Sequence, residues 1–287
     1  MKNTHLRPKP FVKWAGGKTR MLKELRPFFK KWDKHRYVEP FVGGGALLFD
    51  LQRKKALIND YNKELITAYR VIQDDSQIEI LMEILNDVYQ GKERDEPFYK
   101  KVRAKIIPDD PVEATARFIY LNKSCFNGLY RVNTKGKFNV PMGKSKSPPK
   151  LFDKNNLMSC HEFLKSGVEI FDGDYYNTLE KIQKNDVVYL DPPYKPFSKT
   201  SSFTQYTEKD FIDSDQNKLK DYCDHLNEIG AKFVLSNSNV NYIKILYNNY
   251  SNTTKEVMAS RSIGANKYKG KTINTRKKVG ELIITNF

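Results

Sequence analysis

Short apolar segments recur along the chain, and several of them end in a glycine or an acidic residue. Residues 37–41 and 56–59 have the β-branched and aromatic character of strands. Between them, the glycines at 43–45 predict a tight turn, and residues 46–52 predict a helix with one apolar face. A strand, a glycine turn, a helix and a second strand that ends at Asp60 are the opening of a doubly wound α/β fold.

The pattern changes in the middle of the chain. From about residue 64 to residue 103, apolar residues fall at the three- and four-residue steps of helices, and a basic stretch rich in glycine and asparagine follows at 122–149. Strand-like segments then return at 168–171, 187–190, 232–235 and 282–285. We therefore expect a Rossmann-like α/β domain made of residues 1–64 and 165–287, interrupted by a largely helical domain at residues 65–164.

The composition indicates in which cellular compartment the protein resides. The chain has 287 residues, enough for one large domain or for one domain with an insertion. Its apolar runs are shorter than the roughly 18 residues of a membrane-spanning helix, and residues 1–10 lack the apolar core of a signal peptide. Three widely spaced cysteines suit a reducing compartment, and the histidines do not pair with them at zinc-ligand spacing. We expect a cytoplasmic protein without a metal site or a membrane partner.

The net charge of +16 is unevenly distributed. Three windows contain basic but no acidic residues: six lysines or arginines in residues 1–20, eight in 114–152 and seven in 257–280. The rest of the chain holds 29 basic and 34 acidic residues, so the whole positive excess lies in these windows. Solvating lysines scattered at random would not leave such acid-free gaps. Because the windows lack the apolar stripe of a membrane-surface helix, we interpret them as parts of a surface that binds a polyanion.

The first glycine turn has the composition of a nucleotide-binding unit. Its glycines let the backbone approach a ligand, and Asp60 can accept hydrogen bonds from ribose hydroxyls. The spacing from Phe41 to Gly45 departs from the dinucleotide fingerprint, so a plain strand–helix connection is an alternative. A second segment, residues 16–19 (GGKT), ends like the phosphate-binding loop of an ATPase. That loop requires a glycine where this chain has Val12, which argues against the ATPase interpretation.

The strongest chemical candidate is the loop Asp191-Pro192-Pro193-Tyr194. It follows an apolar run and so lies at the carboxyl end of a strand, where open α/β sheets bind their ligands. The prolines stiffen the loop and lack amide donors, which leaves local carbonyls to accept hydrogen bonds. A carboxylate and a carbonyl that hold both hydrogens of an aromatic amine would direct its nitrogen toward a methyl donor, and Tyr194 can stack on a base. We predict that these four residues are catalytic; a rigid turn without chemistry is the alternative.

Several motifs occur together in one order. They are residues 10–18 (PFVKWAGGK), 39–45 (EPFVGGG), 58–60 (IND), 126–133 (FNGLYRVN), 138–141 (FNVP) and 191–194 (DPPY). Taken together, over residues 9–284, the chain resembles the Dam-type (D12 class, alpha group) DNA adenine-N6 methyltransferases. The resemblance implies a Rossmann-like catalytic domain, an inserted helical target-recognition domain, and methyl transfer from S-adenosyl-L-methionine to an adenine flipped out of double-stranded DNA. The cofactor contacts that it implies are Trp14, Lys18, Glu39, Phe41, Gly43, Gly45, Asp60 and Asp191.

The same resemblance assigns a set of DNA contacts: Lys13, Phe126, Leu129, Arg131, Asn133, Asn139 and Lys144. Phe126 resembles a ring that fills the space left by the flipped base, whereas Leu129 could simply anchor the loop. Arg131 resembles a reader of guanine O6 and N7, and Lys13 occupies the position that reaches the first base pair of the target. The asparagines and Lys144 resemble phosphate contacts. The usual target of the family is GATC; the stretch at 264–275 looks longer than in close family members.

Two other functions are open on the sequence alone. The loop could methylate an amine in another nucleic acid, or the chain could be a catalytically silent DNA-binding relative. Every position that the chemistry requires is filled, which favours an enzyme. We expect a monomer, and the sequence leaves a restriction-modification, phage or housekeeping role equally open.

Overall fold

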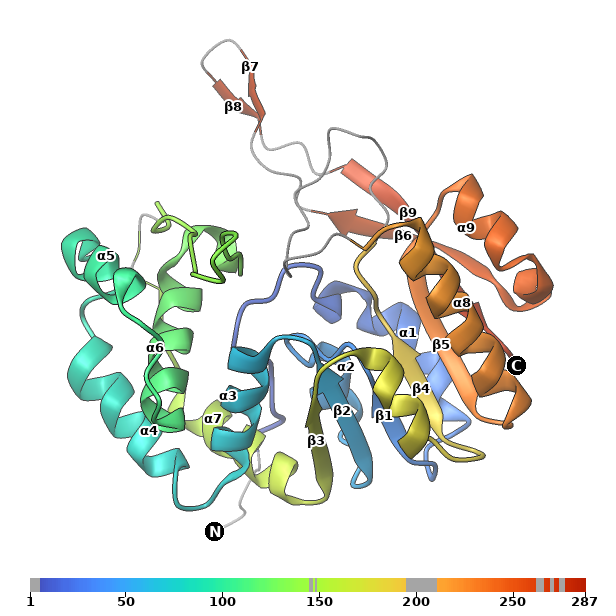
Figure 1. Ribbon diagram of the computed structural model, residues 1–287, viewed down its shortest axis with the longest axis horizontal. Coiled ribbons are helices and arrows are strands. Elements are labelled where there is room, and N and C mark those ends of the chain that lie inside the picture. The colour runs from blue at the N-terminus through green and yellow to red at the C-terminus, as the bar shows by residue number, and fades with distance from the viewer. Residues whose placement is uncertain are drawn as a thin grey trace.

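A seven-stranded sheet runs through one half of the molecule (Figure 1), with strand order β3-β2-β1-β4-β5-β9-β6. The computed structural model describes residues 6–144, 147, 149–194, 211–261, 266–268, 271–273 and 277–287. The strands are β1 (Tyr37–Glu39), β2 (Ala56–Asp60), β3 (Val168–Asp172), β4 (Val187–Leu190), β5 (Lys232–Ser238), β6 (Lys255–Arg261) and β9 (Lys277–Thr285). The first five are mutually parallel, whereas β9 runs antiparallel to β5 and β6. The predicted α/β class is therefore confirmed.

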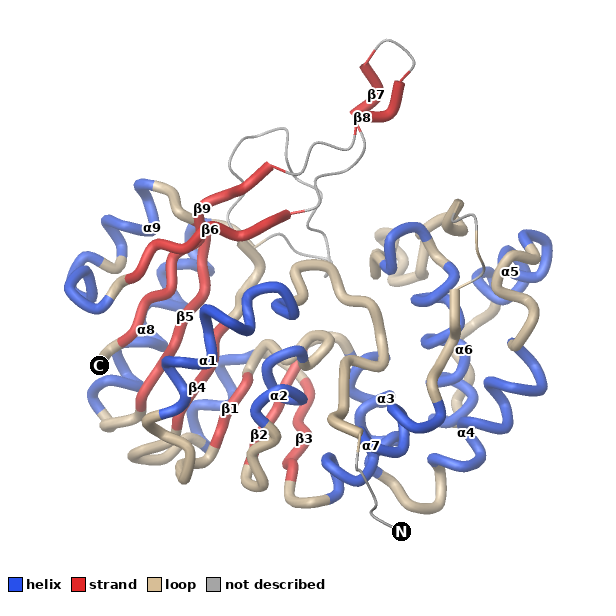
Figure 2. The backbone as a smooth tube through the Cα atoms, turned by 180° about the vertical axis from the view of Figure 1, so that it is seen from behind, coloured by secondary structure: helices blue, strands red, loops and turns tan. Residues whose placement is uncertain are grey.

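Successive side chains of a strand point to opposite faces of the sheet, which explains why helices cover both faces. Tyr37 and Tyr189 pack with α1 on one face, whereas Val38 and Val188 pack with α8 on the other. Because side chains alternate between faces with a period of two, strands that are apolar throughout need helices on both sides. Figure 2 shows α1 and α2 in front of the sheet when it is seen from behind, and Figure 1 shows α8 on the opposite face.

The helices of this half of the molecule, and the short turns near them, have these bounds: η1 (Lys18–Met21), α1 (Leu22–Lys30), α2 (Ala46–Leu51), η4 (Tyr175–Lys181), α8 (Asp213–Glu228), α9 (Asn241–Leu246) and η5 (Asn248–Thr253). The order β3-β2-β1-β4-β5 reverses direction between β1 and β4. Open α/β sheets bind their ligands outside the carboxyl ends of the strands at this point. The fold thus directs attention to the residues that follow β1 and β4.

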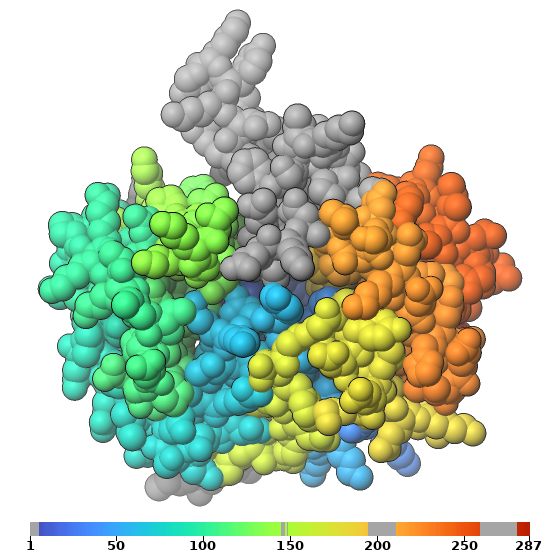
Figure 3. Space-filling view, in the orientation of Figure 1, coloured from blue at the N-terminus to red at the C-terminus, as the bar shows by residue number. Residues whose placement is uncertain are grey.

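The segment between β2 and β3 is mostly helical. It contains α3 (Lys63–Gln73), α4 (Ile78–Ile84), η2 (Leu85–Tyr89), α5 (Glu96–Ala104), α6 (Pro111–Ser124), η3 (Phe126–Gly128) and α7 (Lys154–Lys165). Aspartates cap three of these helices: Asp95, Asp110 and Asp153 each accept a hydrogen bond from the backbone amide three residues later. Figure 3 shows the segment, coloured cyan to green, on one side of the molecule and the later residues in orange on the other. Its core is continuous with one face of the sheet.

Two sequence expectations need correction. The first strand ends at Glu39 rather than at residue 41, because Pro40 has no amide hydrogen to continue the ladder. Strand β6 was not expected, since its residues lie at the start of a window interpreted only through its charge. The other expected strands are confirmed. In the stretch at 264–275, the structure describes β7 (Asn266–Tyr268) and β8 (Lys271–Ile273), which pair antiparallel; the rest lies outside the described residues.

The three cysteines, all of them among the described residues, are buried free thiols. Within the same part of the chain, no helix combines the length and apolar character needed to cross a membrane.

The turn after β1 gives a test of the fold. Gly45 has φ +68°, and a Cβ there would lie 2.5 Å from Tyr69 Oη. We expect Gly45→Ala to lower the free energy of unfolding by about 3 kcal/mol, the sum of left-handed strain and overpacking. Gly91→Ala is the matched control, because Gly91 also has positive φ (+81°) but open space around it. It should cost about 1 kcal/mol. Urea unfolding measures both, and equal losses would contradict the packing argument.

Candidate active site

Four buried or largely buried acidic side chains meet at the carboxyl edge of the sheet. Glu39 ends β1, Asp60 ends β2 and Asp191 follows β4. Glu281 belongs to β9 but pairs with Ser238 at the carboxyl end of β5, so it reaches the same edge. Their proximity is visible in their electrostatics: the charges of Asp191 and Asp60 both raise the pKa of Glu39, and Glu281 raises the pKa of Asp191.

Lys18 forms an ion pair with one member of this acidic cluster. Its Nζ is 2.7 Å from Asp191 Oδ1, and the two side chains are only 8% and 18% exposed. The ammonium also donates a hydrogen bond to the Gly16 carbonyl at 3.1 Å and lies 4.7 Å from the centroid of the Tyr194 ring. The ion pair therefore joins the N-terminal segment to the loop after β4.

Burial is the largest influence on the pKa values of Glu39, Asp60 and Asp191. It raises the pKa of Asp191, and the adjacent Lys18 charge and hydrogen bond only partly oppose that rise. Burial likewise raises the pKa of Glu39 well above its usual range, although Glu39 accepts a hydrogen bond from Tyr37 Oη at 2.9 Å. The pKa of Asp60 is also raised by burial and lowered in part by backbone amides. The site thus holds four acidic groups, of which Asp191 is paired with Lys18.

The glycine turn fixes the orientation of Asp60. Gly43 donates its amide hydrogen to Asp60 Oδ2 at 2.9 Å, and Asn62 donates to Oδ1 at 3.0 Å. Gly43 has φ +48°, and a Cβ on it would lie 2.7 Å from Trp14 Cδ1. No larger residue could therefore bring this turn so close to the Trp14 ring. Phe41 stacks at a tilt on Tyr175, with 4.7 Å between ring centroids.

The tyrosine of the predicted catalytic loop is held by a residue that the sequence analysis missed. Tyr194 donates its hydroxyl hydrogen to Glu281 Oε2 at 3.0 Å. Glu281 is only 3% exposed. The available signal was an acidic residue directly before the apolar strand segment 282–285. Pro192 is buried and Pro193 half-buried, so all four predicted catalytic residues are in the described part of the site.

The predicted base reader lies on a small hairpin after α6. Val132 and Phe138 form an antiparallel bridge, and the amide of Asn139 donates to the Arg131 carbonyl at 3.0 Å. Arg131 Nε in turn donates to Asn139 Oδ1 at 2.7 Å. Asn133 Oδ1 accepts hydrogen bonds from two amides of the turn, both at 3.0 Å. One side chain therefore orients Arg131, and the other stabilises the turn itself.

The two apolar residues of the preceding loop differ in environment. Phe126 is 41% exposed, which is unusual for a large apolar side chain, whereas Leu129 is half-buried and packs against the core. Lys13 and Lys144 are exposed. Trp14 links this loop to the glycine turn after β1, because its ring lies against Gly43 and stacks on Tyr130 with 5.9 Å between centroids. Tyr130 then donates its hydroxyl hydrogen to Glu64 Oε1 at 2.7 Å.

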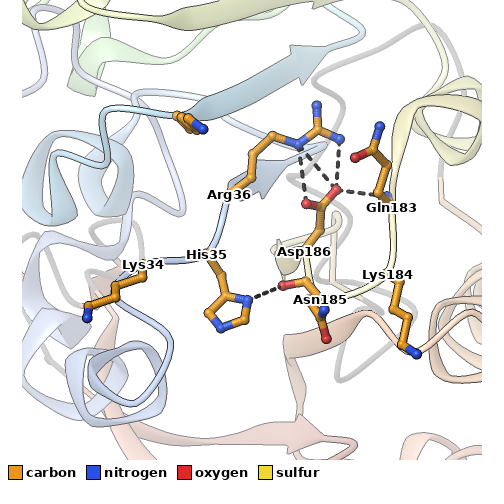
Figure 4. A pocket seen from close by; sticks show the side chains of 8 residues that line it. Lys34, His35, Arg36, Gln183, Lys184, Asn185 and Asp186 are labelled. Carbon is orange, nitrogen blue, oxygen red and sulfur yellow. Dashed lines mark hydrogen bonds and ion pairs between the residues drawn. The ribbon is translucent and has the colours of Figure 1, made fainter.

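A pocket of about 410 Å³ lies at the opposite edge of the sheet. Figure 4 shows its lining, in which the Arg36 guanidinium points at the Asp186 carboxylate and His35 points at the Asn185 carbonyl. Arg36 Nη2 is 2.7 Å from Asp186 Oδ2. Because these residues directly precede β1 and β4, the ion pair joins the amino ends of the two strands. The pocket is therefore separate from the acidic cluster.

Comparison with known proteins agrees with this geometry. The family model of the D12 class N6 adenine-specific DNA methyltransferases matches residues 14–263. The Type II methyltransferase M.MjaIII of Methanocaldococcus jannaschii is 42% identical over 297 residues, which cover 97% of this chain and 99% of the relative. The Type II methyltransferase M1.LlaDCHI of Lactococcus lactis subsp. cremoris is 38% identical, covering 97% and 95%. A protein named DNA adenine methylase from Haemophilus influenzae is 32% identical, covering 97% and 93%.

The family match covers most of the chain, including the acidic cluster up to Asp191, and the relatives align over nearly their whole length. The family implies a methyl donor and a DNA substrate. The chain belongs to the D12 class of N6 adenine-specific DNA methyltransferases.

Proposed function

We propose that this enzyme transfers a methyl group from S-adenosyl-L-methionine to the N6 amine of an adenine flipped out of double-stranded DNA, within the sequence GATC. The observation that carries the proposal is the acidic cluster at the carboxyl ends of the strands. Glu39, Asp60, Asp191 and Glu281 lie together at this edge, and Asp191 is paired with Lys18. A cationic ligand would offset the cost of burying the remaining carboxylates.

S-adenosyl-L-methionine suits this donor set, because it carries positive charge and, when bound, supplies an electrophilic methyl group. The two oxygens of Asp60 are held by backbone amides and still have lone pairs that can accept hydrogen bonds from ribose hydroxyls. Trp14 and Lys18 would contact the cofactor with Asp60 and Asp191. The remaining contacts would come from Glu39, Phe41, Gly43 and Gly45.

We assign the activation of the target amine to the loop at residues 191–194. The lone pair of an aromatic amine is delocalised into its ring, so the free amine is a poor nucleophile. We assign its two hydrogens to the Asp191 carboxylate and the Pro192 carbonyl, which together favour a pyramidal nitrogen. The Tyr194 ring would stack on the flipped base while its hydroxyl is held by Glu281. Asp191 must be ionised for this role, and Lys18 favours the ionised form.

Target recognition is assigned to the helical segment at residues 65–164. Its support is the exposed ring of Phe126 beside the hairpin that presents Arg131. In this proposal Phe126 fills the space left by the adenine, Arg131 reads a guanine, and Lys13 reaches the first base pair. Leu129 would contact DNA only at its exposed edge, while Asn133, Asn139 and Lys144 would contact phosphates.

The names of relatives suggest a biological context. Two of them are named Type II methyltransferases, and the Haemophilus influenzae relative is named DNA adenine methylase. We propose that this chain protects DNA within a restriction-modification system and acts as a monomer, because one chain carries both the acidic cluster and the recognition hairpin.

Replacement of the catalytic acid tests the reaction. Asp191→Ala removes the group that holds the amine, so transfer of tritiated methyl to duplex DNA should fall by at least about 100-fold. Nucleoside analysis of the wild-type product should give N6-methyladenine, and circular dichroism should confirm that the variant is folded. Methylcytosine as the product, or undiminished transfer by the variant, would refute the assignment.

Removal of the lysine tests how Asp191 is kept ionised. Without the Lys18 charge, the pKa of Asp191 should rise further, so a smaller fraction is ionised at a given pH. In Lys18→Gln the acid limb of kcat/KM should therefore move to higher pH, and activity should recover as the pH rises. Lys23→Gln, which removes an exposed lysine of α1, should leave the profile unchanged. A loss that is equal at every pH would mean that Lys18 acts through binding alone.

Two substitutions can distinguish a residue that reads a base from a residue that contacts a phosphate. Arg131→Ala should cost about 1–3 kcal/mol of discrimination at one base pair, measured as kcat/KM ratios on duplexes with single changes. Lys144→Ala should instead weaken binding equally on all sequences and reduce its salt dependence. If Arg131→Ala behaves like Lys144→Ala, Arg131 is a phosphate contact.

A further inference from the structure

Two asparagines hold the N-terminal segment against the helical part of the molecule. Asn122, near the end of α6, accepts the Lys13 amide hydrogen at 2.9 Å and donates to the Lys13 carbonyl at 2.7 Å. Asn156, in α7, makes the same pair of bonds with Lys9, at 2.8 and 2.9 Å. Each side-chain amide thus satisfies both backbone groups of one residue, as a neighbouring strand would.

Asn122 makes a third hydrogen bond, which reaches the loop that carries Phe126. Its Nδ2 also donates to the Gly128 carbonyl at 3.3 Å, and its side chain is 1% exposed. One buried amide therefore connects α6, the N-terminal segment and the loop that carries Phe126. The corresponding bonds of Asn156 are exposed to solvent.

Gly128 also packs directly against Lys13. It has φ +65°, and a Cβ on it would lie 2.3 Å from the Lys13 Cβ. Lys13 is therefore confined between Asn122 and the loop, while its side chain remains exposed. These contacts fix the backbone and Cβ of Lys13, from which its side chain extends, relative to the loop that carries Phe126.

We propose that Asn122 is a positioning residue for sequence discrimination, which fixes Lys13 in register with the target-recognition loop. This inference rests on the proposed function of Lys13 as the residue that reaches the first base pair. Asn122 acts through Lys13 and contacts neither DNA nor cofactor. Its loss should therefore affect the choice of the first base pair more than turnover on the preferred duplex.

The experiment compares kcat/KM for GATC duplexes with kcat/KM for duplexes altered at one base pair. Asn122→Ala and Lys13→Ala should each lower discrimination at the first base pair about tenfold, and both should leave discrimination at the Arg131 pair intact. The double variant should be no worse than Lys13→Ala alone, because both changes remove one interaction. Asn156→Ala, the matched control, should discriminate like the wild type.

Asn122→Asp provides a second variant if the alanine variant does not fold. It has nearly the same shape and keeps the bond from the Lys13 amide, but it loses both donated bonds, so it should show the same loss at the first base pair. Additive effects with Lys13→Ala, equal losses at every base pair, or the same loss in Asn156→Ala would overturn the inference. An active enzyme in which Lys13→Ala discriminates normally would also overturn it. If the wild type transfers no methyl group to duplex DNA, the proposed function itself fails, and the inference with it.

Discussion

The ion pair between Lys18 and Asp191 determines how the rest of the site is arranged. It brings a lysine from the N-terminal segment to the carboxyl end of β4 and buries both charges at 2.7 Å. Removal of one partner would leave an uncompensated charge among other carboxylates, which is far more costly than loss of an exposed pair. The N-terminal segment must therefore lie across the edge of the sheet, with Trp14 against the glycine turn.

The same segment connects two parts of the protein that the proposed reaction uses together. At Lys18 it contacts the loop after β4, and at Trp14 it lies between the glycine turn and Tyr130 of the loop after α6. At Lys13 it is bonded to the end of α6. The six residues 13–18 thus contact the glycine turn, the loop after β4 and the loop after α6.

Much of the fold could be predicted because the parallel strands are buried on both faces and read as continuous apolar runs. The acidic residues at the ends of β2 and β4 followed from that assignment. Glu39 was named only through the family resemblance, because its strand was expected to continue to residue 41. Glu281 could not be found in this way, since it lies within an edge-proximal antiparallel strand whose pairing with β5 is a long-range contact. The turn-stabilising bonds of Asn133 were also invisible, because they depend on hairpin geometry and not on residue type.

The Arg36–Asp186 pair has a consequence for the shape of the sheet. It joins β1 and β4 where they begin, and their pairing covers only Tyr37 and Val38 of β1. Glu39 remains paired with β2. The two central strands are therefore joined at their amino ends, and their pairing ends before Glu39. The acidic residues Glu39 and Asp191 thus lie where β1 and β4 are no longer paired with each other.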